Sequence, residues 1–261
     1  MNAIAVILTN SIRCRIGLIV LILAASVGCS DAEPRKRAHS PSLAAGLASE
    51  RKIDFHPYGE DSPRLAAGNL QSWVMAKWVA DGDTIILHDG RHVRYIGIDT
   101  PEIDHKNHRA EPMGDEAQSM NRQLVDGWKL RLVYDREKTD RYGRTLAYVY
   151  RGDGLFVNAE LLKRGYAHVL YHFPNISKEK ILLSAQRVAM EHGRGIWQRV
   201  KKDPQQPHSY LGNRRSRRFH AHDCPMGKRI SEKNRIWLKN QWAGFWSGYA
   251  PARECIDFPS P

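Results

Sequence analysis

Apolar and polar positions alternate between Trp73 and Ile98, the period of strands that bury one face of a sheet. Two Asp-Gly pairs, at residues 81–82 and 89–90, interrupt the alternation and favour tight turns. The runs between the turns are rich in β-branched and apolar residues, a composition typical of strands. This region is therefore predicted to form a β-meander with strands over 73–78, 84–87 and 92–98.

Apolar residues recur at helical spacing in three later segments, each followed by a glycine that favours a helix end. Ser177 precedes the third segment and is predicted to cap it. The helices are expected over 117–125, over 157–164 and between Ser177 and Gly193, and two more strands over 128–134 and 145–150. Five strands with interspersed helices fit an α+β, mainly β fold: a small closed five-stranded barrel of OB type with packing helices.

The first 29 residues have the pattern of an export signal. Two arginines precede the apolar stretch Ile16–Val27, which has signal-peptide length. Small residues then precede Cys29, as at a bacterial lipoprotein cleavage site, so Cys29 is a candidate for lipidation. Because Ser26 is not the usual aliphatic residue, ordinary cleavage and an uncleaved anchor remain open. We predict an exported protein, either a periplasmic, envelope-attached lipoprotein or a secreted one.

Composition divides the rest of the chain into three parts. Residues 30–70 mix Pro, Ser, Ala, Gly and charges without a period and are predicted to be a linker. The periodic region 71–199 is the predicted barrel domain, and 208–258 a small C-terminal module. A hydrophobic content of 42% excludes wholesale disorder. No apolar run reaches the roughly 20 residues of a membrane helix, which excludes a polytopic membrane protein.

The chain has 261 residues and a formal net charge of +12. This balance favours an anionic partner: nucleic acid, an anionic membrane surface or an acidic polymer. Residues 200–261 hold 12 Lys and Arg against 5 Asp and Glu, whereas residues 71–199 hold 20 against 17. The excess positive charge is thus concentrated in the C-terminal quarter, which is where we expect an anionic partner to be attracted.

Arg94 lies among isoleucines in the third predicted strand, on the face that carries Ile96 and Ile98. Because an unpaired charge is costly to bury, Arg94 needs a carboxylate or a phosphate as its partner. A structural ion pair with Glu102 or Asp99 and a contact with a substrate phosphate are both open at this point.

Asp83 and Asp99 offer carboxylate oxygens, the ligands that hard divalent cations prefer, although Asp83 also fits ordinary turn chemistry. Pro101 fixes the chain direction before Glu102, whose ionised carboxylate can accept a proton from water. Arg144 is either a phosphate ligand or a solvated surface arginine. Two acids for a metal, one acid for a water and two guanidiniums for a phosphate together suit phosphodiester hydrolysis.

The segment from about Ser72 to Gln198 resembles the staphylococcal nuclease (thermonuclease) family in the order and spacing of its motifs. The resemblance implies an OB-fold barrel that cleaves DNA and RNA with Ca²⁺ at the bond between phosphorus and the 5′ oxygen, which releases 3′-phosphate products. The matching stretches are Asp-Gly-Asp-Thr at 81–84, Arg94 with Asp-Thr-Pro-Glu at 99–102, Gly-Asp-Glu-Ala at 114–117, Thr-Asp-Arg-Tyr-Gly-Arg at 139–144, Leu-Ala-Tyr at 146–148, Val-Asn at 157–158 and Gly-Ile-Trp at 195–197.

The resemblance also implies roles for single residues by position. The carboxylates of Asp83 and Asp99 and the backbone carbonyl of Thr100 would hold calcium. Glu102 would act as general base or orient the water. Arg94 and Arg144 would bind and stabilise the phosphate.

Further substrate contacts follow from the same resemblance. Arg141 and Tyr142 would hold the terminal phosphate and sugar, and Tyr171 would lie against a base. The sequence departs from the family in the loop 103–112, which does not align with the family's lysine-bearing loop, and at Phe173, where another tyrosine is expected. An aromatic platform still permits base stacking, so we predict low base specificity and a preference for single-stranded or fraying substrate.

The C-terminal segment resembles a small Ada-like module that is sometimes appended to such nucleases. That module is expected to end in Pro-Cys-x-x-Cys, but here Ala252 replaces the first cysteine, so the zinc site is damaged. Two alternatives stay open: zinc bound by His220, His222, Cys224 and Cys255, or a disulfide between the two cysteines, which export favours. The module's core is expected to contain Trp237, Trp242, Phe245, Trp246 and Tyr249.

The sequence thus predicts an exported, Ca²⁺-dependent nuclease with DNA, RNA or both as its partner. We expect a monomer that meets a membrane only through an N-terminal lipid or an uncleaved signal. A non-catalytic nucleic-acid-binding envelope protein is the alternative, and an envelope adaptor that docks a partner through its C-terminal module is a third reading.

Overall fold

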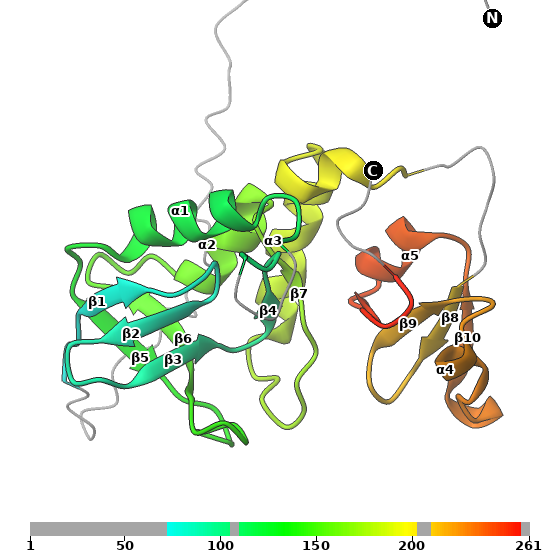
Figure 1. The fold of residues 1–261 in the computed structure, drawn as a ribbon, viewed down its shortest axis with the longest axis horizontal. Helices are drawn as coiled ribbons and strands as arrows, with labels where there is room; N and C mark the ends of the chain where they lie inside the picture. Colours follow the sequence, from blue (N-terminus) through cyan, green and yellow to red (C-terminus); the bar gives the residue numbers. More distant parts are fainter. Residues whose placement is uncertain (1–71, 105–109, 203–209, 257–261) are drawn as a thin grey trace, which may run out of the picture. The chain divides into compact units, whose positions relative to one another are not determined.

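The computed structural model describes residues 72–104, 110–202 and 210–256 (Figure 1). The predicted signal with Cys29 and the predicted linker over 30–70 lie outside the described residues. In the described part of the chain, no helix has both the length and the apolar character that crossing a bilayer requires.

A five-stranded sheet forms the centre of the fold. It contains β1 (Ala76–Val79), β2 (Thr84–Leu87), β3 (His92–Tyr95), β5 (Leu130–Val133) and β6 (Thr145–Arg151). The order is β1-β2-β3-β6-β5, and only β3 and β6 are parallel neighbours. Val74, just before β1, exchanges backbone hydrogen bonds of 2.9 and 2.7 Å with Leu130 of β5, so the two sheet edges meet. This curled sheet confirms the predicted mainly β fold of OB type.

Three helices pack against the barrel: α1 (Gly114–Val125), α2 (Val157–Arg164) and α3 (Glu179–Glu191) (Figure 1). The bounds of α2 are those predicted, because Gly165 adopts a left-handed conformation with φ 80° and ends the helix. The faces that strands and helices turn inward form the core, in which Ile85, Val93 and Leu161 are fully buried. Hydrophobic burial of this kind is the main stabilising contribution to such a barrel.

The third predicted strand, over 92–98, is interrupted, and this correction matters for the site. β3 ends at Tyr95, and Gly97, with φ 79°, turns the chain. β4 (Ile98–Asp99) then leaves the five-stranded sheet and pairs with β7 (His168–Val169). The predicted shared face of Arg94, Ile96 and Ile98 is therefore wrong, since a turn separates the first residue from the last.

The prediction that Ser177 caps the third helix is also wrong. The N-cap residue of α3 is Lys178, and it makes no side-chain capping hydrogen bond. Ser177 lies one residue earlier, and its backbone N–H donates to Asp135 Oδ2 at 2.9 Å. A carboxylate from the loop after β5 thus anchors the chain before the helix.

The C-terminal module is a second, four-stranded sheet with two short helices. The sheet has the order β10-β8-β9-β11. Its strands are β8 (Tyr210–Asn213), β9 (Arg218–Ala221), β10 (Arg235–Leu238) and β11 (Ala250–Pro251), and its helices are α4 (Pro225–Lys228) and α5 (Gln241–Trp246). The 3₁₀ turn η1 (Gly195–Arg199) precedes β8, and the 3₁₀ turn η2 (Glu232–Asn234) precedes β10.

The module shares a hydrophobic core with the end of the barrel domain. The ring of Phe245 in α5 packs edge-on against Trp197 of η1, with centroids 5.0 Å apart, and against Phe219 of β9 at 5.2 Å. Gln186 of α3 donates a 2.7 Å hydrogen bond to the Phe245 carbonyl. Phe245 belongs to the module's core as expected, but Trp237 is 66% exposed on the edge strand β10, which corrects its predicted place.

Candidate active site

The turn before β2 carries Asp83 into the interior. The Asp83 N–H donates to Asp81 Oδ1 at 2.9 Å, a local bond typical of Asp-rich turns. Gly82 allows the turn to approach Thr100, because a Cβ at this position would lie 2.6 Å from the Thr100 Oγ1. Thr100 then donates to Asp83 Oδ2 from its backbone N–H at 3.0 Å and from its hydroxyl at 3.1 Å. Two of the predicted metal ligands, Asp83 and Thr100, are therefore held together by direct hydrogen bonds.

Arg94 lies between the two buried aspartates. Its Nη1 is 3.0 Å from Asp83 Oδ2, and its Nη2 donates to Asp99 Oδ1 at 2.8 Å. Nη1 also donates to the Ile98 carbonyl at 2.9 Å, across the turn that separates β3 from β4. The sequence left carboxylate and phosphate partners open, and the structure supplies two carboxylates.

Glu102 lies at the rim of this cluster. Its backbone N–H donates to Glu111 Oε2 at 2.9 Å, and its side chain is 36% exposed. Gly114 at the start of α1 approaches the same backbone so closely that a Cβ there would lie 2.3 Å from the Glu102 carbonyl oxygen. The N-terminus of α1 thus fixes the backbone that presents the predicted general base.

Arg253 from the C-terminal module reaches into the cluster. Its Nη1 donates to Glu102 Oε1 at 2.7 Å, and its Nη2 donates to Asp99 Oδ2 and to the Thr100 carbonyl, both at 3.2 Å. The same nitrogen lies 3.6 Å from Glu111 Oε2. A single guanidinium therefore contacts three of the residues to which the family resemblance assigns calcium or water.

Burial and charge determine how these groups titrate. Burial raises the pKa of Asp83 well above its ordinary value, against the pull of Arg94, and the carboxylates of Asp81 and Asp99 add to the rise. Burial acts in the same direction on Asp99, but Arg253 and Arg94 lower the pKa of that carboxyl below its ordinary value. A positive charge beside Asp83 and Asp99 therefore stabilises the ionised form of both carboxyls.

A buried histidine lies beside Asp99. His168 Nε2 is 3.8 Å from Asp99 Oδ2, and its Nδ1 is 3.2 Å from the Val169 carbonyl oxygen. Burial lowers the pKa of His168 to about 4, although the Asp99 carboxylate opposes the shift. His168 is therefore neutral at pH 7 and adds no charge to the site.

Three of the remaining predicted substrate residues lie on the loop between β5 and β6, and the fourth, Tyr171, lies after β7. Arg144 Nε donates to Asp140 Oδ2 at 2.8 Å, and its guanidinium lies 5.6 Å from the ring centroid of Tyr142. Arg141 donates to the Tyr142 hydroxyl at 2.6 Å. Tyr171 follows β7, with the Arg217 guanidinium 5.8 Å from its ring centroid. The structure therefore joins Arg144, Arg141 and Tyr142 to one another, whereas Arg94, the aspartates and Glu102 form the acidic cluster.

The acidic cluster fits a hard divalent cation. Its donors are the carboxylates of Asp83 and Asp99 and the carbonyl oxygen of Thr100, which are oxygens of the kind that Ca²⁺ binds, and the Glu102 carboxylate lies beside them. Burial is the main cause of the raised pKa of Asp83, the carboxylates of Asp81 and Asp99 add to it, and a bound cation would favour the ionised form. These residues would hold the cation, and it would neutralise phosphate charge.

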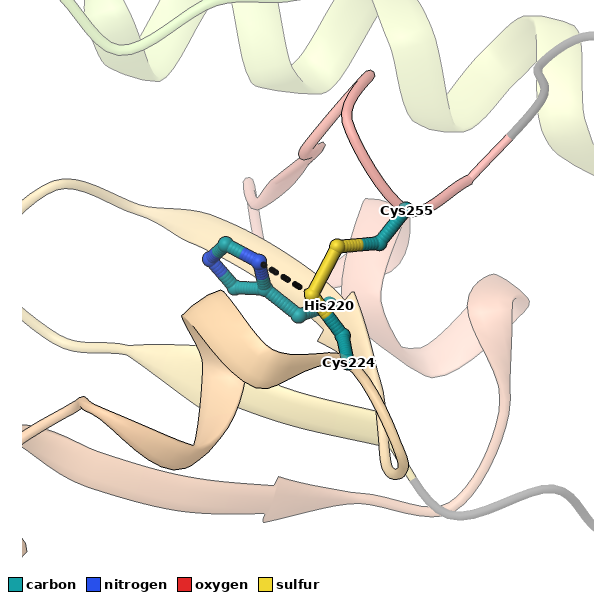
Figure 2. Close-up of side chains that lie close together, drawn as sticks. All are labelled: His220, Cys224 and Cys255. Carbon is teal, nitrogen blue, oxygen red and sulfur yellow. Dashed lines mark hydrogen bonds between the residues drawn. A yellow bond between two sulfur atoms is a disulfide. The ribbon is translucent and has the colours of Figure 1, made fainter.

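A separate cluster lies in the module. Cys224 and Cys255 form a disulfide, and His220 Nδ1 lies 3.6 Å from the Cys224 sulfur (Figure 2). The three side chains offer ligand atoms within 4.8 Å of one another, whereas His222 is exposed and lies outside this group. The structure thus contains the disulfide alternative and removes His222 from the predicted ligand set.

Arg253, Glu111, His168 and Arg218 are site residues that the sequence did not reveal. Arg253, His168 and Arg218 come to the cluster from distant elements, whereas Glu111 lies nine residues after Glu102, just before α1. No motif spacing links any of them to the cluster. The charge excess after residue 200 is the one signal in the sequence that pointed toward the module, although not to Arg253 itself.

An OB barrel with an acidic, oxygen-rich cluster and an arginine between its carboxylates is the arrangement expected of a phosphodiesterase. The family model for staphylococcal nuclease homologues matches residues 92–199. The chain is similar to a thermonuclease of Staphylococcus intermedius, with 41% identity over 128 residues that cover 48% of this chain and 76% of that relative. A thermonuclease of Staphylococcus hyicus is 39% identical over 139 residues, 52% of this chain and 81% of the relative. Endonuclease YncB of Bacillus subtilis (strain 168) is 34% identical over 172 residues, which cover 61% of this chain and 80% of that relative.

These relatives are matched over most of their length. The chain therefore belongs to the staphylococcal nuclease family.

Proposed function

We propose that this protein is an exported, Ca²⁺-dependent nuclease that hydrolyses phosphodiester bonds of DNA, RNA or both with low sequence specificity. It releases 3′-phosphate products. Relatives named thermonuclease and endonuclease support a nuclease hydrolase. The observation that carries the proposal is the convergence of Asp83, Asp99, Thr100 and Glu102 around Arg94.

The roles of the acids follow from their exposure and partners. Asp83 and Asp99 are buried, so they suit the binding of an ion rather than the transfer of a proton. Glu102 is partly exposed and can meet a water molecule. It takes the proton as the water oxygen attacks phosphorus, the bond from phosphorus to the 5′ oxygen breaks, and the leaving 5′ oxygen takes a proton from solvent. When bound, Ca²⁺ supplies Lewis-acid stabilisation of the phosphate oxygens.

The arginines stabilise the charge that develops on the phosphate. Arg94 is fixed by Asp83 and Asp99 and needs no reorganisation to present its guanidinium, while Asp140 orients Arg144 in the same way. The exposed ring of Tyr142 and the aromatic residues after β7 offer faces to sugar and bases of any sequence. The chain therefore discriminates weakly among bases and prefers strands whose bases are unpaired.

One assay tests the enzymatic proposal. The purified chain without residues 1–29 is incubated with single-stranded DNA and single-stranded RNA, in Ca²⁺ and in chelator. We expect cleavage only with Ca²⁺ and fragments that end in 3′-phosphate. The absence of cleavage at every neutral to alkaline pH would contradict the proposal and favour the non-catalytic nucleic-acid-binding alternative.

Glu102→Gln separates catalysis from binding. The amide keeps the shape of the side chain but cannot take a proton, so we expect turnover to fall by roughly 10²–10⁴-fold while an oligonucleotide still binds. Full turnover in this variant would show that Glu102 is not the base. Glu191→Gln is the matched control, because it makes the same change of charge at an exposed position at the end of α3.

Export and lipidation rest on the sequence of the first 29 residues. We expect the mature chain in the envelope fraction or the medium, and fatty-acid label on Cys29. Cys29→Ser should remove the label, and label that persists in this variant would rule out Cys29 as the lipid site.

A mass increase of about two daltons on reduction distinguishes the Cys224–Cys255 disulfide from a zinc complex, which loses its metal to a chelator instead.

A further inference from the structure

Two adjoining cavities lead away from the acidic cluster along the C-terminal module. The first, of about 380 Å³, is lined by Asp99, Arg253, Arg218 and Ser216 among others. The second, of about 370 Å³, shares Ser216 and Arg218 with the first and continues to Arg215. One cleft therefore runs from the predicted catalytic centre to the turn between β8 and β9.

The two walls of the outer cavity differ in chemistry. The module contributes the guanidiniums of Arg215 and Arg218, and Arg215 is exposed. The segment after β7 contributes Tyr171 and Phe173, and the Phe173 side chain is 66% exposed. Guanidiniums opposite aromatic faces suit a polymer that carries phosphates on one side and flat bases on the other.

The guanidinium of Arg218 is partly buried, which supports a binding role rather than a role in solubility alone. Its Nη1 donates to the Pro251 carbonyl at 3.1 Å, so its guanidinium is oriented at the junction of the two cavities. Burial lowers the pKa of Arg218 from its ordinary value, while the Asp99 carboxylate opposes this effect. A positive charge held partly out of water binds an anion more strongly than a solvated one.

We propose that this cleft binds a single strand of nucleic acid beyond the scissile phosphate, with Arg215 and Arg218 on successive phosphates and Tyr171 and Phe173 against the bases. The module is then a part of the substrate site of the nuclease. This inference rests on the proposed function, because the strand in the cleft is the substrate of the acidic cluster.

The length dependence of binding tests the cleft. Fluorescence anisotropy measures the affinity of labelled oligothymidylates of about 2 and 10 nucleotides for the Glu102→Gln chain in Ca²⁺. We expect the longer strand to bind at least tenfold more tightly. Arg215→Ala and Phe173→Ala should each reduce this gain several-fold, and Arg215→Ala should also make the salt dependence shallower by about one counterion.

Arg214→Ala is the matched control, because Arg214 is an exposed arginine on the same turn that lines neither cavity. Equal losses in Arg214→Ala and Arg215→Ala would overturn the proposal in favour of diffuse attraction to the module. Equal binding of inorganic polyphosphate, or a double strand bound more tightly than a single one, would also overturn it. Cleavage by the wild-type chain is measured in parallel; if it is absent, the proposed function fails, whereas the length effect judges the cleft alone.

A second inference rests on a different observation, the hydrogen bonds of Arg253 to the acidic cluster. Arg253 contacts Asp99 Oδ2 and the Thr100 carbonyl, which are oxygens that fit a divalent cation, and it also contacts Glu102 Oε1 beside them. A guanidinium and a cation cannot occupy the same oxygens, and each neutralises the same negative charge. We infer that Arg253 competes with the cation for the cluster and thereby sets the cation affinity of the site.

Calorimetric titration with Ca²⁺ alone, without substrate, tests this competition. Arg253→Gln retains much of the side-chain volume but no charge, so we expect Ca²⁺ to bind at least tenfold more tightly than in the wild-type chain. Arg229→Gln is the control for a general loss of charge, because Arg229 is an exposed arginine whose Nη1 contacts the Met226 sulfur. Unchanged or weaker Ca²⁺ binding in Arg253→Gln would overturn the competition, and binding in neither chain would overturn Ca²⁺ as the cation.

Discussion

Arg94 shows at the scale of one residue why a binding site also supports the fold. Its guanidinium separates two buried carboxylates and also bonds the Ile98 carbonyl across a turn. Removing it leaves Asp83 buried without its positively charged partner, and leaves Asp99 with Arg253 alone. The same residue is therefore expected to affect stability and substrate binding.

Arg94→Ala should lower the free energy of unfolding by roughly 3–5 kcal/mol, because removing one partner of a buried ion pair leaves an uncompensated charge. Urea unfolding in chelator measures the effect. Arg91→Ala is the control, because Arg91 pairs with Asp89 on the exposed side of the neighbouring turn and should cost less than about 1 kcal/mol. Similar losses in the two variants would refute the buried pair as a source of stability.

Asp135, outside the site, is expected to make the stability of the fold depend on pH. Partial burial raises the pKa of Asp135, but hydrogen bonds from the Ser177 N–H, the Tyr148 hydroxyl and the Arg136 N–H outweigh burial and lower it below its ordinary value. A lowered pKa in the folded state means that the carboxylate stabilises the fold above its ordinary pKa and loses this effect as the pH falls through the folded value.

Asp135→Asn should therefore reduce the free energy of unfolding by about 1–2 kcal/mol at pH 7, and the difference from the wild-type chain should shrink below about pH 4. Urea unfolding at a series of pH values measures it. A difference that stays constant down to pH 3 would show that Asp135 does not act through its ionised form.

The sequence predicted one half of the site and missed the other for a physical reason. Asp83, Asp99 and Glu102 lie in short motifs, so local spacing and family resemblance point to them together. Arg253 lies 151 residues after Glu102 and reaches it only because the module packs on α3. No local pattern reports such a contact, because the packing of two separate sheets decides it.

At the scale of elements, glycines determine how closely helices and turns approach the site. Gly97 ends β3 and redirects the chain into β4, which the alternating pattern hid because apolar residues continue on both sides. The helix over 157–164 was predicted with its correct bounds, since a glycine at its end is a local signal. Elements with local stop signals were predictable, and the break inside an apolar run was not.

Gly114→Ala tests the close approach of α1 to the site. An added Cβ would lie 2.3 Å from the Glu102 carbonyl oxygen, so either the helix or the Glu102 backbone must move. We expect a loss of roughly 1–3 kcal/mol in stability and a larger fall in kcat than in affinity for a labelled oligonucleotide. Cleavage kinetics and urea unfolding measure the two effects.

Gly152→Ala is the control for this prediction, because a Cβ there would meet its nearest atom, the Lys129 carbonyl oxygen, at an ordinary 3.5 Å. It should leave kcat unchanged and alter stability by less than about 1 kcal/mol. A fall in kcat of the same size in both variants would refute the specific link between Gly114 and Glu102.

For the molecule as a whole, charge and packing support the proposal that the C-terminal module is part of the substrate site. Most of the excess positive charge follows residue 200, and Arg218 and Arg253 bring part of it to the edge of the acidic cluster. Phe245 and Gln186 join the module to the barrel domain through buried contacts. The position of Arg253 therefore depends on how firmly the module's last strand and loop are held.

The disulfide holds that loop. Cys255 follows Arg253 by two residues, and its bond to Cys224 closes a segment with a sequence separation of 31. In the chain-entropy model such a closure stabilises the folded module by about 3–4 kcal/mol. Cys224→Ser with Cys255→Ser should therefore lower the unfolding midpoint and loosen the contact between Arg253 and Glu102. Calorimetry should then show tighter Ca²⁺ binding than in the wild-type chain, in the same direction as Arg253→Gln. If the double variant unfolds more readily but binds Ca²⁺ with unchanged affinity, the disulfide stabilises the module without controlling Arg253.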